Sequence, residues 1–437
     1  MTYFLLNLKG LFQKKWFIIF GLIFLLFFQL IYSFLFPVYG TEQNLQFIST
    51  NIPEIRQIYP LISSDYRIIS TDTPSYLESA QNFSSEELGG RFTLARPLYP
   101  FLIFLTSIPF SFLSAPSLSL TFFLSILVNF ILISLAVILF FFLLKNLFSL
   151  KVAWLSSVLL IFSPFVHNSI VQPLAEMLMI FAVALTAYFL YNYIKKPSIP
   201  KLIFYSLVIG VLMLGKMFFA ISFFILLLAI YFKRYKEGII FSIVHLIPLA
   251  LWYLWVTQVW KINYHVMEID YWQMGVWVFD IFRLPWQETA KVFLRAVPYF
   301  TTSLFYSFFC IPIIFSLIGL KRIVSKSKNI FYFGSIASFF LLGFLINLYA
   351  YRHTFLLFPV IYPTAILGIE RVADLLRKQR SWFYPLFWIL AIGLIILISN
   401  VNFYKVFNFD YFSIVHWSHW PIPSFLENIF KSISGHY

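Results

Sequence analysis

Apolar runs separated by short basic connectors make up most of this chain of 437 residues. The run Leu118–Leu144 has no charged residue, and at a rise of 1.5 Å per residue it is long enough to cross the roughly 30 Å hydrocarbon core of a bilayer. With 61% hydrophobic residues, 11% charged residues and a mean hydropathy of +0.86, the chain has more apolar surface than a soluble fold could cover. The sequence therefore predicts an all-α polytopic membrane protein.

The cysteine content and the charge limit the kinds of site and partner that the protein can have. The single cysteine, Cys310, excludes an intramolecular disulfide and a metal–thiolate centre. A net charge of +14 would suggest nucleic acid as the partner of a soluble protein. In a membrane protein the positions of Lys and Arg matter more than their sum, because basic residues gather in cytoplasmic loops.

The topology follows from where the basic residues fall. Lys9, Lys14 and Lys15 precede the first apolar run and predict a cytoplasmic N-terminus. A signal peptide is the alternative, although the run is long and lacks a small-residue cleavage site. Alternating inner and outer ends give about eleven spans, with most Lys and Arg inside. The expected spans are Trp16–Phe36, Leu118–Leu144, Val152–Val166, Pro173–Tyr193, Leu202–Leu214, a return segment ending at Phe232, Ile239–Thr257, Tyr299–Leu320, Ile330–Tyr349, Thr354–Ile369 and Phe383–Ser399.

Two segments depart from simple spans. Leu98–Ser114 contains Pro100 and Pro109, and a full crossing would put the next basic connectors outside, so we expect a helix lying in or dipping into the outer leaflet. The run Leu202–Phe232 is too long for one span and has Lys216 near its middle. A helical hairpin with Lys216 at its outer tip avoids an insertion cost of about 2.5–3.5 kcal/mol. A single tilted span with a snorkelling lysine is the alternative.

We expect residues 1–400 to form one polytopic membrane domain, followed by a short external tail at residues 401–437. Two external loops, at about residues 37–117 and 258–298, interrupt the apolar runs. The first is a long polar segment between two very hydrophobic regions. We interpret it as the site.

Asp72 opens the segment DTPSYLESA in the first external loop. Asp before Thr-Pro is a favourable helix N-cap, so a structural role alone would explain it. A carboxylate at a helix start near the membrane surface, followed by RPLYPFL with Arg96, would also suit the removal of a proton from an incoming hydroxyl. The residues alone leave both interpretations open.

Other charged residues stand out in apolar surroundings. Glu176, in QPLAEML, lies at the outer boundary of a predicted span, where an ionisable group is a functional hypothesis by default. Its alternative role is a favourable charge at a helix N-terminus. Lys216 and Arg352 stand alone in apolar sequence, where cations are suited to bind phosphate. Binding of anionic lipid headgroups is the alternative for these cations.

Taken in order, these segments resemble the GT-C superfamily of membrane glycosyltransferases, specifically the branch of protein O-mannosyltransferases and bacterial lipid A aminoarabinose transferases. The resemblance extends over roughly residues 16–369. The matching segments are DTPSYLESA in the first external loop, RPLYPFL after it, QPLAEML at the start of the fourth span, GVLMLGKMFF at the hairpin and YRHTFLLFPVIYPTAILG at the late basic motif.

The resemblance implies a polyprenyl-phosphate sugar donor and an acceptor hydroxyl on a lipid, glycan or protein, used at the outer face of the membrane. It implies catalytic roles for Asp72 and Glu176. It also implies that the donor phosphate is bound by Lys216, Arg352, Arg96 and His353.

Three features depart from the family pattern. Thr73 follows Asp72 where relatives carry a second carboxylate, and Met177 stands where a proline is common. The tail 401–437 is too short for the sizeable external domain of some relatives. We therefore expect no two-carboxylate or metal-binding arrangement at Asp72 and expect the external loops to recognise the acceptor. The sequence does not decide whether a divalent metal takes part.

The sequence thus predicts a cell-envelope glycosyltransferase that performs an inverting displacement, with Asp72 as base and cations stabilising the departing phosphate. A transporter or flippase of a lipid-linked or anionic substrate is the main alternative, but the chain shows no internal repeat and its outer charges gather at one face. A catalytically inactive relative that organises envelope assembly is a third reading. The composition is compatible with a bacterial inner membrane, and we expect no nucleic-acid partner.

Overall fold

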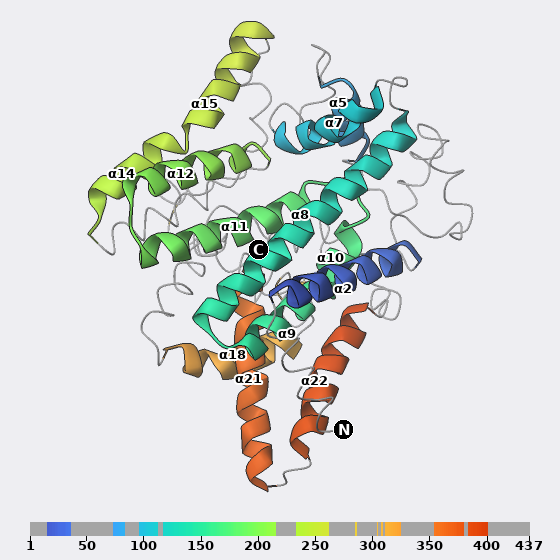
Figure 1. Ribbon diagram of the computed structural model, residues 1–437, viewed down its shortest axis with the longest axis vertical. Coiled ribbons are helices and arrows are strands. Elements are labelled where there is room, and N and C mark those ends of the chain that lie inside the picture. The colour runs from blue at the N-terminus through green and yellow to red at the C-terminus, as the bar shows by residue number, and fades with distance from the viewer. Residues whose placement is uncertain are drawn as a thin grey trace.

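The computed structural model describes residues 15–35, 73–83, 96–111, 117–215, 233–261, 285, 304, 307–308, 311–324, 354–379 and 383–400. Every regular element in these ranges is a helix, as the sequence predicts (Figure 1). In chain order the elements are α2 (Lys15–Leu35), α5 (Thr73–Gln81), α7 (Leu98–Ser111), α8 (Leu118–Leu147), α9 (Leu150–Ile161), α10 (Pro164–Ser169), α11 (Glu176–Lys195), α12 (Ile199–Met213), α14 (Tyr235–Val244), α15 (Ile247–Leu254), η1 (Trp255–Val259), α18 (Ile311–Val324), η2 (Phe355–Leu357), α21 (Phe358–Gln379) and α22 (Phe383–Asn400).

Five helical segments in the described ranges are long and apolar enough to cross a membrane. They are Trp16–Ser33, Leu120–Leu147, Glu176–Tyr193, Tyr235–Val259 and Phe355–Arg377. Each coincides with an expected span, so the prediction of a polytopic helical membrane protein is confirmed. The total of eleven spans stays a prediction.

Helix α8 is the element on which most of the described fold packs. Its 30 residues give it a length of about 45 Å. Ser117 caps it, because its side-chain oxygen accepts a hydrogen bond from the Leu120 backbone N–H at 3.2 Å. Helices α2, α5, α7, α9 and α11 all contact α8. In Figure 1, α8 runs diagonally across the centre and α5 and α7 lie at the end where it begins.

The expected span Val152–Val166 is wrong at its end, because the structure breaks it into two helices. Helix α9 ends at Ile161, and α10 begins at Pro164. The Ser163 side chain accepts from the Val166 N–H at 3.2 Å, so Ser163 and Pro164 form an N-cap followed by a first-turn proline. All six residues of α10 are buried.

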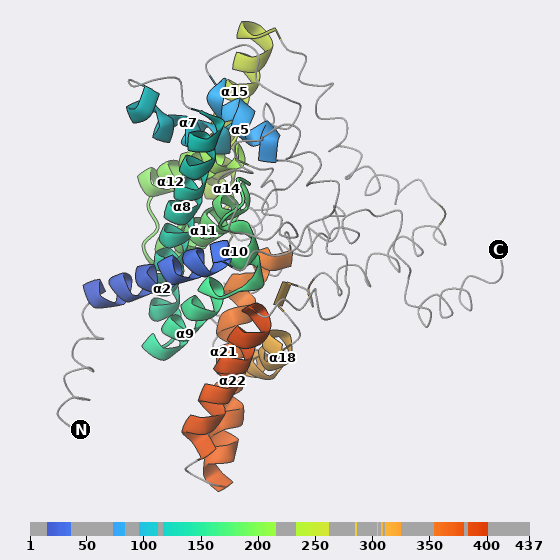
Figure 2. The same ribbon diagram turned by 90° about the vertical axis from the view of Figure 1, so that its right-hand side faces the viewer.

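A buried histidine attaches α10 to α2. His167 Nδ1 lies 3.1 Å from Gln29 Nε2 and 3.1 Å from Ser33 Oγ. The Tyr32 ring lies 5.3 Å from the imidazole, measured between centroids. Figure 2 shows α10 beside the C-terminal end of α2. These contacts hold α10 in place ahead of the turn that leads to α11.

Two segments that the sequence sets apart from simple spans are described in part. Helix α7 has 14 residues, about 21 Å, a length that it shares with α18, so its position in the outer leaflet stays a prediction. Helix α12 ends at Met213, and Leu214 and Gly215 form a turn, so no helix runs on through them. The hairpin with Lys216 at its tip stays a prediction. Residues 216–232 lie outside the described residues.

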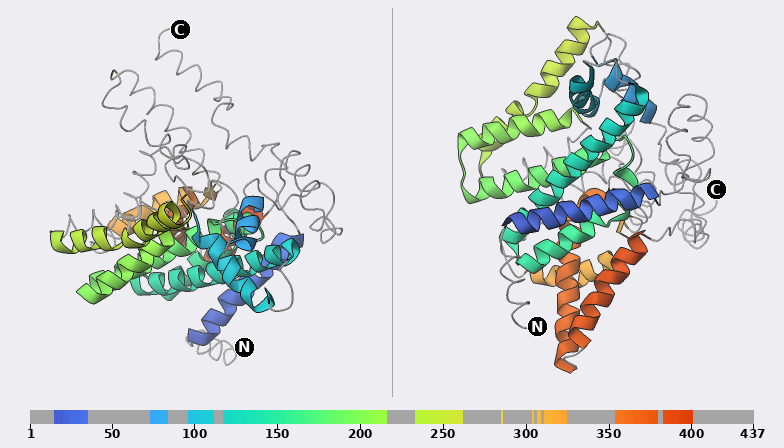
Figure 3. Two further views of the ribbon diagram at one scale, coloured as in Figure 1. Left: turned by 90° about the horizontal axis from the view of Figure 1, so that it is seen from above. Right: turned by 45° about the vertical axis from the view of Figure 1, so that its right-hand side comes forward.

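Helices α18 and α21 run in the same direction and pack closely. Their contacts advance together along both helices, from Ser316 with Thr364 to Arg322 with Glu370 (2.6 Å). Two parallel helices fit the expected alternation, in which residues 330–349 cross back between them; that stretch lies outside the described residues. Figure 3 shows α22 beside α21.

The expected span Thr354–Ile369 is too short at its C-terminal end. Helix α21 continues to Gln379, nearly three turns further. Arg322 of α18 contacts two carboxylates on this extension, Glu370 at 2.6 Å and Asp374 at 2.8 Å. The extension is therefore a polar helix end that an apolar pattern does not detect.

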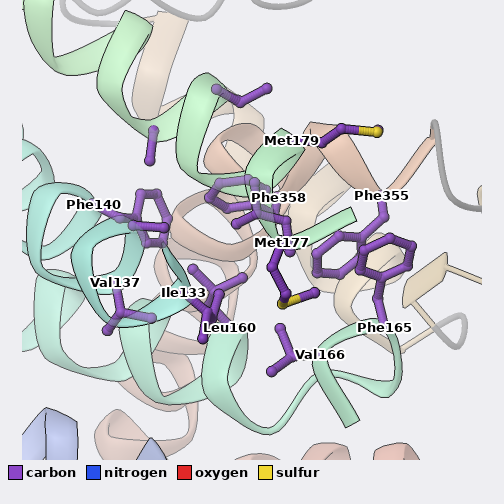
Figure 4. Packing of buried hydrophobic residues seen from close by; sticks show 14 of the residues in the cluster. Ile133, Val137, Phe140, Leu160, Phe165, Val166, Met177, Met179, Phe355 and Phe358 are labelled. Carbon is purple, nitrogen blue, oxygen red and sulfur yellow. The ribbon is translucent and has the colours of Figure 1, made fainter. Parts of the chain in front are cut away.

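Aromatic side chains join the late helices to the middle of the fold. Phe355 of η2 stacks on Phe165 of α10, with ring centroids 4.5 Å apart. Phe358 of α21 meets Phe140 of α8 edge-on at 5.1 Å. Figure 4 shows these rings packed around Met177, which follows Glu176 in α11. The buried core thus reaches the beginning of α11.

Candidate functional site

The structure describes two of the predicted site residues, Arg96 and Glu176. Only 7% of Arg96 and 4% of Glu176 is exposed. A buried charge is costly unless the protein surrounds it with compensating groups, so such residues in a membrane protein point to function. Asp72, Lys216, Arg352 and His353 lie outside the described residues.

Arg96 lies in the segment that connects to the beginning of α7. Two residues later, the Leu98 backbone N–H donates to the Leu214 carbonyl at 3.2 Å. This bond joins two segments that are far apart in sequence, RPLYPFL and GVLMLGKMFF. The structure therefore brings the Arg96 segment to the turn that precedes Lys216 in sequence.

Gly215 brings the same turn against α11. A Cβ atom at this position would lie 2.3 Å from Leu178 Cδ2, a separation that real Cβ atoms do not show. Leu178 lies two residues after Glu176, and its side chain is buried. The absence of a side chain at position 215 is thus what allows the turn to approach the beginning of α11.

Glu176 is the first residue of α11, where a negative charge is favoured by the helix dipole. The residue before it, Ala175, makes no side-chain cap. The interaction of its charge with the helix dipole therefore explains why a glutamate stands at this position. It does not explain why Glu176 is buried, since an exposed glutamate would interact with the dipole as well.

Asn129 of α8 holds the turn in front of Glu176. Its side-chain Nδ2 donates to the carbonyls of Ser169 at 3.4 Å, Ile170 at 3.3 Å and Gln172 at 2.6 Å. Its Oδ1 accepts from the Tyr99 hydroxyl at 2.9 Å. One buried amide therefore bridges α7 and the approach to α11.

Tyr99 is the meeting point of three segments. It lies three residues after Arg96, and its hydroxyl donates to Asn129, which holds the turn in front of Glu176. Its ring meets that of Tyr76 of α5 edge-on at 5.4 Å. Helix α5 begins at Thr73, directly after Asp72 in sequence. A chain of contacts thus links the described parts of four predicted motifs.

The late basic motif lies against α10. Thr354, which follows His353 in sequence, shares a hydrogen bond of 2.6 Å with Ser307. Phe355 then stacks on Phe165 of α10, as described above. Helix α10 leads directly into the turn before Glu176. The fifth motif is therefore connected to the site through this short helix.

Sequence reasoning missed Asn129 and Tyr99. The signal for Asn129 was present, because it is the one amide side chain in the apolar run Leu118–Leu144 and polar groups in such runs need partners. Tyr99 lies inside the quoted motif RPLYPFL, but its hydroxyl partner comes from another helix. Only the packing of α7 on α8 shows that link.

The described ranges contain no cluster of side chains that could bind a metal ion. In these ranges no group of three or more His, Cys, Asp or Glu side chains comes together. Glu176 and Arg96 by themselves provide one carboxylate and one cation. A divalent metal at the site stays an untested expectation.

Comparison with solved structures finds a similarity to the archaeal oligosaccharyltransferase AglB from Archaeoglobus fulgidus, in complex with an inhibitory peptide and a dolichol-phosphate. The TM-score is 0.52 at 12% sequence identity, over 87% of this chain and 56% of that one. The chain thus spans a little over half the length of this neighbour. Protein-family models and curated proteins give no match. At this identity the likeness concerns the fold alone.

Proposed function

We propose that the protein is a glycosyltransferase that moves a sugar from a polyprenyl-phosphate donor to an acceptor hydroxyl at the outer face of the membrane. The observation that carries the proposal is the convergence around Tyr99 of segments that the sequence had singled out separately. A buried cation, Arg96, and a buried carboxylate, Glu176, belong to this convergence. The fold likeness to a protein solved with a dolichol-phosphate supports a lipid-phosphate donor.

The reaction we propose is a single displacement. The acceptor oxygen forms a bond to the anomeric carbon, and the bond from that carbon to the phosphate oxygen breaks on the opposite face. The electron pair leaves with the polyprenyl phosphate, and the hydroxyl proton passes to a carboxylate. The product therefore has the opposite anomeric configuration to the donor.

The residues divide between the two ends of this reaction. Asp72 is the proposed base, and Glu176 is the second carboxylate, which orients the acceptor or the sugar. The leaving phosphate is bound by a set of cations, because negative charge grows there in the transition state. This set is Arg96, Lys216, Arg352 and His353.

A transfer assay tests the proposal. The purified protein in lipid is supplied with a panel of radiolabelled polyprenyl-phosphate sugars, and native protein is compared with Asp72→Asn. Loss of a preorganised catalytic group typically lowers the rate by on the order of 10² or more, and we expect that loss here. Glu78→Gln is the matched control, since Glu78 is an exposed carboxylate on α5 in the same motif, and it should leave transfer unchanged.

Each outcome has a definite meaning. Sugar transfer that disappears in Asp72→Asn and persists in Glu78→Gln supports the enzyme class and the base together. Normal turnover by Asp72→Asn would leave Asp72 as a helix cap and remove the base assignment. If well-folded native protein consumes no donor, the transporter interpretation gains instead.

A further inference from the structure

Asn129 is a buried amide in the middle of an apolar helix. Placing an unpaired amide in an apolar environment costs several kcal/mol, so its contacts are the reason that it is tolerated there. They use both ends of the side chain: Nδ2 points to backbone carbonyls and Oδ1 to the Tyr99 hydroxyl. Because carbonyls only accept and the hydroxyl can donate, these partners fix the orientation of the amide.

The carbonyls belong to a turn with few bonds of its own. Gln172 N–H donates to the Ser169 carbonyl at 3.3 Å, and Leu174 N–H to the Gln172 carbonyl at 2.8 Å. Pro173 has no N–H to contribute. The shortest bond of Asn129, at 2.6 Å, also goes to Gln172. The turn is therefore held largely from α8, and it determines where α11 begins.

The hydroxyl belongs to the segment that carries Arg96. Tyr99 lies three residues after Arg96, and its hydroxyl donates to Asn129 Oδ1 at 2.9 Å. One amide on α8 thus holds α7 through a phenol. The same region of α8 fixes the start of α7 and the start of α11.

We propose that Asn129 and Tyr99 form a positioning relay that keeps Glu176 in register with the Arg96 segment. This inference rests on the proposed function. The relay acts through Glu176 and touches no substrate. Displacing a reacting group by about 1 Å can lower a rate by on the order of 10², so loss of the relay should lower turnover, with the donor KM little changed.

The test compares Tyr99→Phe and Asn129→Leu in the native and Glu176→Gln backgrounds. Tyr99→Phe removes one hydroxyl and should lower kcat about tenfold; Asn129→Leu also releases the turn and should lower kcat about 100-fold. If both act through Glu176, they should have little further effect in Glu176→Gln, because coupled sites are not additive. Ser134→Ala is the control, since this hydroxyl bonds a carbonyl of its own helix, Phe130, at 2.7 Å.

A second measurement does not depend on activity. The carboxyl band of Glu176 in pH-induced infrared difference spectra is identified by its loss in Glu176→Gln. It should shift in Tyr99→Phe, which keeps the fold even if Asn129→Leu does not, and stay unchanged in Ser134→Ala.

The outcomes separate this inference from the proposed function. Suppose that native protein transfers sugar, but the effects of the two substitutions on kcat add fully to that of Glu176→Gln. The relay is then wrong and the enzyme class stands. The same conclusion follows if the two substitutions leave kcat and the infrared band unchanged. If native protein transfers no sugar from any donor, the proposed function fails, and the infrared band still decides whether Tyr99 and Asn129 position Glu176.

Discussion

The α18–α21 pair and the region around Tyr99 bury their helix contacts in different ways. In the pair, backbone meets backbone: a Cβ at Gly319 would lie 1.9 Å from the Thr364 carbonyl oxygen, and one at Gly368 would lie 1.9 Å from that of Phe315. Around Tyr99, helix ends meet, and side-chain hydrogen bonds join them. The first arrangement leaves no space between helices, whereas the second brings N–H groups, carbonyls and charges together.

Because of this difference, we expect the α18–α21 pair to contribute mainly to stability and the region around Tyr99 mainly to activity. Close packing of small residues lets membrane helices associate without polar side chains, but a ligand cannot enter such a contact. Helix ends carry backbone groups without intrahelical partners, which makes them suitable places for polar chemistry. We therefore expect substitutions in the pair to reduce folding, and substitutions around Tyr99 to reduce activity per folded molecule.

The largest effect should come from Gly368→Val. Any side chain here meets backbone atoms, the Phe315 carbonyl at 1.9 Å and the Gly319 nitrogen at 3.1 Å, so no change of rotamer relieves the clash. Overpacking in cores typically costs about 1–3 kcal/mol, and this clash should reach the upper end or exceed it. Size-exclusion chromatography of a fluorescent fusion in detergent should show loss of the monodisperse peak.

Gly393→Val is the matched control for this prediction. A Cβ at Gly393 of α22 meets nothing within 4 Å, so the peak should persist. A normal peak for Gly368→Val would contradict the backbone contact between α18 and α21.

Arg96→Gln should have the next largest effect, on activity. It removes a buried cation from the segment joined to the turn at Leu214 and Gly215, so the proposed stabilisation of the leaving phosphate should be lost. We expect kcat/KM for the donor to fall by on the order of 10², with a normal elution profile. Arg96→Lys should recover part of this, because lysine keeps the charge without the fork of donors. Donor kinetics equal to those of the native protein would exclude Arg96 from phosphate binding.

Gly215→Ala should have a smaller effect on turnover, and a second substitution, Leu178→Ala, should reverse most of it. The new methyl group would overlap Leu178 Cδ2, the end of a side chain that can move, so the turn should shift away from α11 at a cost of about 1 kcal/mol. Turnover should fall about tenfold if the shift reaches Glu176. Leu178→Ala added to Gly215→Ala makes room for the methyl group and should restore most of the activity.

Gly393 is also the control for the predicted clash between a methyl group at position 215 and Leu178. Gly393→Ala, with open space around its Cβ, should leave turnover and thermal stability unchanged. If Gly215→Ala is equally silent, the turn does not lie against Leu178 in the active protein.

Local patterns predicted the class of fold and singled out the segments of the candidate site. Apolar runs mark spans because the bilayer requires them, and an isolated charge such as Glu176 stands out against such a run. The break at Ser163 and Pro164 was also visible as a capping signal within an apolar stretch, but the expected span ran across it.

The links between segments could not be read from the sequence. The bond from Leu98 to Leu214 joins backbone atoms, and backbone atoms carry no residue signature. The partner of Tyr99 on α8 is set by how two helices pack, which depends on the whole core. Gly215 could be recognised as a glycine of a hairpin, but its neighbour Leu178 could not.

The smallest effect should come from Arg322→Ala, although its two ion pairs are the shortest in the described ranges. Arg322 Nη1 lies 2.6 Å from Glu370 Oε2 and Nη2 lies 2.8 Å from Asp374 Oδ2, but the side chains are between 27% and 44% exposed. Solvent-exposed pairs contribute about 0–1 kcal/mol, so we expect a loss of roughly 1 kcal/mol of stability and no loss of turnover per folded molecule. Thermal unfolding at low and high salt measures this, because screening should shrink the difference between native and variant protein. A loss as large as that of Gly368→Val that disappears at high salt would mean that charge rather than close backbone packing holds the pair together. A loss that persists at high salt would mean that packing of the Arg322 side chain, and not its charge, contributes the stability.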